Sequence, residues 1–223
     1  MNERSERIVA GLSGIAFVVL SAVVAALPPF PAVGASAQAV VAYYGAHQRA
    51  FLVLNFFGVA GLVPGLVVLA YLTAVFRRAE REGGWLWILT LAGGLFAFIA
   101  AWVDLALFQC AAYAAVRGDE RIARALSDVA TLTFGTFFLA QFAFSAAFAW
   151  AARALRTWPG WVGATSALVA LLSLVASWGA VDTAGALAAG GPVTLVAFLA
   201  IVLWFLAFSI LILVRAPSAA PAS

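Results

Sequence analysis

Long apolar runs alternate with short polar segments along nearly the whole chain. Six of these runs are long enough to cross the hydrocarbon core of a bilayer, which takes about 20 residues of helix. They cover approximately residues 8–27, 50–76, 85–115, 131–154, 161–180 and 193–214. A β-barrel would instead show alternating segments of about ten residues. The pattern therefore predicts an all-α, polytopic membrane protein, with a six-helix transmembrane bundle that forms a single domain over residues 1–215.

Two polar stretches between the runs are predicted to form short helices on the outer side of the membrane. Residues 35–49 include Tyr43 and Tyr44, and tyrosine rings favour the interface between lipid and water. In residues 117–128, charges of opposite sign recur every four positions, a spacing that supports a helix through ion pairs. The last segment, 216–223, consists of small residues and proline, so we expect it to be disordered.

Composition supports membrane insertion and excludes several kinds of chemistry. Hydrophobic residues make up 66% of the chain and charged residues 9%, and the mean hydropathy is +1.10. All twelve basic residues are arginine, which excludes a retinal Schiff base and a phosphate-binding loop. One histidine and one cysteine are too few for a bis-histidine haem, a Cys/His zinc site or an internal disulfide. We therefore expect no cofactor and no bound metal.

Arginine placement predicts the orientation, because short arginine-rich loops remain cytoplasmic. With the N-terminus inside, eight arginines fall on the inner side: Arg4, Arg7, Arg77, Arg78, Arg81, Arg153, Arg156 and Arg215. Four fall on the outer side: Arg49, Arg117, Arg121 and Arg124. Both termini are therefore expected in the cytoplasm. A net charge of +3, carried mainly at span ends, suits a membrane surface and not a nucleic acid.

The first span has a competing interpretation as a cleaved secretory signal. Two arginines precede it, and Ala35-Ser36-Ala37 has the small-residue pattern of a cleavage site. Its apolar run of about 20 residues is longer than a usual signal core of roughly 7 to 15. We therefore favour an uncleaved first helix, and the orientation of the other spans is the same in both cases.

The layout also resembles a known family. Three short motifs carry the resemblance: VAYY at 41–44, RRAE at 77–80 and WPGWVG at 158–163. Along nearly the whole chain they are similar to a family of uncharacterised bacterial six-span membrane proteins, domain-of-unknown-function family 4386. The resemblance implies this topology and a bacterial inner (cytoplasmic) membrane. Because that family has no assigned activity, the resemblance implies no catalytic residues.

One carboxylate, Asp104, lies inside the third apolar run. An ionisable residue within a span costs roughly 2.5 to 3.5 kcal/mol on insertion scales and is by default a functional candidate. Gly93, Ala97 and Ala111 share its helical face. Small residues let a second helix approach closely, so this face is predicted to point into the bundle.

Other polar residues gather in the outer half of the bundle. With a rise of 1.5 Å per residue, Asn55, Gln109 and Gln141 lie about 9, 6 and 15 Å below the predicted outer ends of their spans, and Asp104 about 13 Å. We predict an outward-opening polar pocket around Asp104. Its ligand-binding candidates are Asn55, Gln109 and Gln141 in the wall and His47, Arg49, Tyr43 and Tyr44 at the rim. The alternative is a structural hydrogen-bond network, with Asp104 protonated or paired with Arg49.

Three further features are interpreted as structural. Cys110 lies in an apolar context and is predicted to be buried. Gly61 and Gly65 form a small-residue pair for helix packing. The tryptophans mostly flank the spans, as in an interfacial belt.

We favour a protein that binds or transports a small molecule, a lipid group or a proton at Asp104. The first alternative is a non-catalytic accessory, assembly or sensing subunit that contacts a membrane-protein partner or a second copy of itself. The second is an intramembrane enzyme that uses His47 and Asp104 as a base and its orienting group. A channel would require an oligomer, because the inner half lacks a polar lining.

Overall fold

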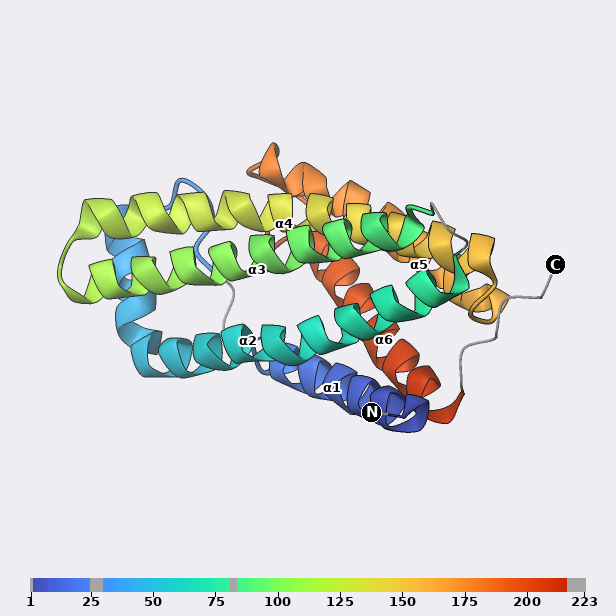
Figure 1. Cartoon of the computed structure of the whole chain (residues 1–223). Helices are drawn as coiled ribbons and strands as arrows, with labels where there is room; N and C mark the ends of the chain where they lie inside the picture. The colour runs from blue at the N-terminus through green and yellow to red at the C-terminus, as the bar shows by residue number, and fades with distance from the viewer. Residues whose placement is uncertain (1, 25–29, 81–83, 216–223) are drawn as a thin grey trace.

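The computed structural model describes residues 2–24, 30–80 and 84–215, and these ranges are helical and contain no strand. The helices are α1 (Glu3–Val24), α2 (Ala37–Ala79), α3 (Leu86–Val116), α4 (Glu120–Leu155), α5 (Gly160–Ala176) and α6 (Pro192–Val214), with a 3₁₀ turn, η1 (Ser177–Ala180), after α5 (Figure 1). Six helical segments, the fifth of which is α5 together with η1, are long and apolar enough to cross a membrane, which confirms the predicted all-α six-span fold. The predicted tail at 216–223 lies outside the described residues.

The two predicted outer helices are not separate elements. α2 begins at Ala37, where the Ser36 hydroxyl accepts from the Ala39 amide at 3.2 Å, and continues to Ala79. Residues 120–128 are likewise the first turns of α4. No proline interrupts either junction, so the backbone hydrogen bonds continue from the polar segment into the apolar one. Figure 1 shows α2 bending sharply near its start without ending.

Three helices are therefore longer than a bilayer requires. α1, α5 and α6 contain 22, 17 and 23 residues, close to the roughly 20 that span the hydrocarbon core. α2, α3 and α4 contain 43, 31 and 36 residues. Their extra length lies together at the end of the bundle away from both termini (Figure 1). We call residues 30–51 and 107–131 at this end the distal lobe.

The molecule has two hydrophobic cores. The bundle core contains a group of aromatic rings from α4 and α6: Phe144, Phe148, Trp204, Phe205 and Phe208. The distal lobe has its own core, which includes Val40, Tyr44, Phe51, Phe108 and Ala111. Two tryptophans depart from the predicted belt, because Trp158 and Trp204 are buried and their rings pack against Phe208.

Glycines allow neighbouring helices to approach each other closely. A Cβ added at Gly93 on α3 would lie 2.9 Å from the Cα of Phe144 on α4. The Gly61 and Gly65 pair packs against Leu20 and Phe17 of α1, as its spacing suggested. At the proximal end of the bundle, where α1 begins, Gly11 faces Leu213 of α6. The prediction for Cys110 was wrong, because this residue is exposed on the surface of α3.

Candidate functional site

Asp104 is buried on α3 and is held by a hydroxyl from α4. The Thr133 hydroxyl donates to Oδ1 of Asp104 at 2.9 Å, and Asp104 is only 5% exposed. Within the described residues, Oδ2 accepts no hydrogen bond and the carboxylate has no ion pair with Arg49, which is exposed. The predicted alternative of an Asp104–Arg49 pair is therefore wrong. One carboxylate oxygen remains available as an acceptor.

Asn55 and Gln109 form a clamp between α2 and α3 beside this carboxylate. The Asn55 side-chain amide donates to the backbone oxygen of Leu105 at 3.1 Å and to Oε1 of Gln109 at 3.2 Å. Asn55 is almost completely buried. Asn55 and Gln109 therefore contact each other, and Leu105, which accepts from Asn55, directly follows Asp104 in α3. The clamp lies between the bundle core and the distal core, where it fixes the register of the two helices.

The predicted rim residues lie in the distal lobe. Tyr44 is fully buried in the distal core, with its ring against Phe51. Its hydroxyl lies near Ser127 and Asp104 but forms no hydrogen bond within the described residues. The His47 ring packs edge-on against Tyr43 at 5.3 Å. No hydrogen bond in the described part of the chain joins His47 to Asp104. The geometry therefore gives no base and orienting pair for the enzyme hypothesis.

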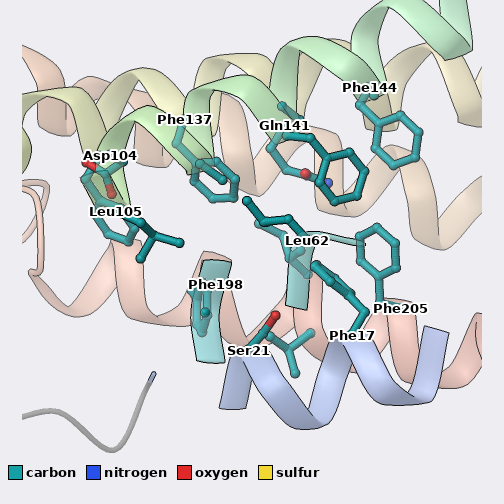
Figure 2. A pocket seen from close by; sticks show the side chains of 18 residues that line it. Phe17, Ser21, Leu62, Asp104, Leu105, Phe137, Gln141, Phe144, Phe198 and Phe205 are labelled. Atoms are coloured by element: carbon teal, nitrogen blue, oxygen red, sulfur yellow. The ribbon is translucent and has the colours of Figure 1, made fainter. Parts of the chain in front are cut away.

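A cavity of about 130 Å³ lies between α1, α2, α3, α4 and α6 (Figure 2). Seven of its lining residues are phenylalanines: Phe17, Phe98, Phe134, Phe137, Phe144, Phe198 and Phe205. Among the described residues, the polar side chains that line it are Ser21, Asp104 and Gln141. Asp104 stands at one end of the group of labelled side chains in Figure 2. The pocket is therefore mainly apolar with an acidic end, and not the polar pocket that the sequence suggested.

Only two of the predicted pocket residues line this cavity. They are Asp104 and Gln141, whereas Asn55, Gln109, Tyr44, His47 and Arg49 do not line it. The Gln141 amide donates to the Ser145 hydroxyl at 3.0 Å. Gln141 follows Thr133 by eight residues, which places it about 12 Å further along α4. The cavity thus has a carboxylate at one end and an amide about two helical turns deeper.

Sequence reasoning missed Thr133 and the phenylalanines. A threonine hydroxyl in an apolar helix usually bonds to its own backbone, so Thr133 carried no distinctive signal. Phenylalanine is common in membrane spans. The spacing of Phe134, Phe137, Gln141 and Phe144 nevertheless puts all four on one helical face, and this pattern was available in the sequence.

Asp104 lies near the level at which the α5 span ends. Its partner Thr133 is two residues before Gly135, where an added Cβ would meet the backbone of Ala180 in η1. The sequence estimate of about 13 Å took Tyr113 as the outer end of the span, but the end of α3 belongs to the distal lobe.

Comparisons of the chain with family models, with curated proteins and with solved structures found no match. The resemblance to the six-span family stays a prediction.

Proposed function

We propose that the protein binds a small amphipathic molecule in the phenylalanine-lined cavity. The N–H or O–H head group of this molecule donates to Asp104, the part of its apolar body next to the head group lies among the rings, and a chain too long for about 130 Å³ extends out of the cavity. The observation that supports the proposal is the carboxylate at the end of the apolar cavity, with one oxygen held by Thr133 and the other without a partner in the described chain. The arginine distribution supports an orientation with both termini in the cytoplasm, and the resemblance to the six-span family supports a bacterial inner membrane.

A cationic amine is the head group that fits Asp104 best. Burying a carboxylate away from water is costly unless an opposite charge with good hydrogen-bond geometry offsets the loss. An ammonium group supplies both a charge and a charge-assisted hydrogen bond, which is shorter and stronger than a neutral one. The faces of phenylalanine rings also attract cations. A neutral hydroxyl would bind less tightly, and a carboxylate head group would be repelled.

The relative affinities of ligands that differ only in their head group test this proposal. The full-length protein is placed in lipid nanodiscs, and the binding of dodecylamine, dodecanol and dodecanoate is measured by native mass spectrometry. These probes have the same chain and differ only in the head group. We expect the affinity to decrease from the amine to the alcohol to the carboxylate.

The Asp104→Asn variant removes the charge and preserves the size of the side chain. We expect it to weaken amine binding by about tenfold or more, equivalent to about 1.4 kcal/mol, and to change alcohol binding much less. Asp119→Asn is the matched control, because Asp119 is exposed in the distal lobe and does not line the cavity. Equal amine affinity in the wild type and in Asp104→Asn would refute the proposal.

A further inference from the structure

The distal route from the cavity to water is filled by packed side chains. Tyr44 and Phe51 are fully buried in the distal core, and Phe30 stacks on Phe108 with 4.2 Å between ring centroids. The backbone amide of Gly34 donates to Asp128 at 3.0 Å, which fastens residues 30–36 to α4. A ligand coming from the distal solution would have to displace this core.

The proximal route is closed by the aromatic group of the bundle core. The ring of Phe148 packs against Trp204 at 5.3 Å and against Phe208 at 5.2 Å, and all three side chains are buried. Large rings that interlock edge to face leave no continuous path. The cavity therefore ends at this group.

Four of the five helix seams around the cavity are also closed. The α4–α6 seam is covered by α5, which packs against both of these helices. The α1–α2 seam is held by the contact of Gly61 with Leu20, where an added Cβ would lie 3.0 Å from the Leu20 Cβ. The α2–α3 seam has the hydrogen bond from Asn55 to Leu105. The α3–α4 seam has Gly93 against the Phe144 backbone. Separating any of these pairs would break a close backbone contact or a buried hydrogen bond.

The packing between α1 and α6 changes along the length of their seam. At the proximal end Gly14 meets the side chain of Ser209, and further along the Phe17 and Phe205 rings lie 4.9 Å apart. Beyond these rings, Ser21 of α1 and Phe198 of α6 both line the cavity. Figure 1 shows the two helices diverging toward the distal side. Because Ser21 and Phe198 line the cavity from the two sides of this seam, the cavity reaches the seam in its distal half.

We infer that the ligand is a single-chain amphiphile dissolved in the bilayer, that its head group enters sideways through the distal half of the α1–α6 seam, and that the part of its chain too long for the cavity stays in this seam. This inference rests on the proposed function. Asp104 lies near the level at which the α5 span ends, so a lipid-like molecule already carries its head group at the depth of the carboxylate. Such a molecule reaches the site by lateral movement alone, and its head group never crosses the apolar interior.

A reversible lock across the seam tests the route. In a Cys110→Ser background, Ser21→Cys and Phe198→Cys are joined by a bifunctional thiosulfonate reagent, and the uptake of dodecylamine from lipid vesicles is followed over time. We expect the lock to slow association by about tenfold or more, and reduction of the crosslink to restore the rate. Amine bound before the lock is applied should be retained. The comparison is between the locked and reduced forms of one molecule, so any effect of the substitutions themselves cancels.

The matched control locks the proximal end of the same seam, with Gly11→Cys and Leu213→Cys. These positions already touch, so this lock should leave the association rate unchanged. An equal rate in the locked and reduced Ser21→Cys/Phe198→Cys protein overturns the lateral route, while the head-group preference and the Asp104→Asn effect still support binding. If neither the reduced nor the wild-type protein binds the amine, the proposed function fails and the route fails with it.

Discussion

Thr133 is the side chain that positions Asp104. Its hydroxyl lies 2.9 Å from Oδ1 of Asp104 and 2.9 Å from the backbone oxygen of Ala130. A hydroxyl has one proton, and a hydrogen bond to an ionised acceptor is roughly twice as strong as one to a neutral acceptor. The bond to the carboxylate should therefore dominate and hold Asp104 at the end of the cavity.

Replacing Thr133 by valine tests this positioning. Valine has nearly the same shape and no donor, so Thr133→Val leaves the buried carboxylate without its hydrogen bond. We expect the free energy of unfolding to fall by about 1 to 3 kcal/mol, measured by denaturation in mixed micelles.

Thr136→Val is the control for this substitution. Thr136 is exposed and bonds only to the backbone of its own helix, at Thr133. Its replacement should change the free energy by no more than about 0.5 kcal/mol. Similar losses for the two variants would show that the Thr133–Asp104 bond contributes little.

Among the helices, hydropathy located the spans more accurately than it located the helix ends. The sixth predicted span, 193–214, agrees with Pro192–Val214, because that helix is apolar throughout. The starts of α2 and α4 were missed because hydropathy falls where a helix leaves the membrane, whereas its backbone hydrogen bonds continue. A helix ends where hydrogen bonding or a cap changes, and hydropathy does not report that change.

At the site, the sequence identified the polar residues but not their grouping. Asp104, Asn55, Gln109 and Gln141 were conspicuous because polar side chains are rare in apolar spans. Asp104 and Gln141 line the cavity, whereas Asn55 and Gln109 join α2 to α3. Which residues fall into which group depends on how five helices cross. Helix crossing is decided by tertiary contacts such as that of Gly93 with Phe144, so the composition of a single span does not reveal it.

The α3–α4 approach can be tested with two glycine substitutions. A Cβ at Gly93 would lie 2.9 Å from the Cα of Phe144, so Gly93→Ala must push the helices apart. We expect it to lower the free energy of unfolding by about 1 to 3 kcal/mol. At Gly45 on α2, nothing lies within 4 Å of an added Cβ. There alanine should stabilise the helix by about 0.5 to 1 kcal/mol. Equal effects of the two substitutions in the same denaturation assay would contradict the close packing.

For the whole molecule, the distal lobe and the N-terminus should lie on opposite sides of the membrane. Ala125 is exposed in the distal lobe and Arg4 is exposed at the start of α1. In a Cys110→Ser background, Ala125→Cys should react with a membrane-impermeant maleimide in intact spheroplasts. Arg4→Cys should react only after lysis. The reverse pattern of labelling would invert the orientation predicted from the arginines.

The central claim is that Asp104 marks the head-group end of a cavity that holds a bilayer amphiphile. The most direct measurement is a density map of the protein purified in its native lipid, compared with that of Asp104→Asn. We predict elongated density beside Asp104 that runs between Phe137 and Phe198, and its loss or weakening in the variant. A cavity that contains no such density in the wild type, or identical density in both proteins, would contradict the account.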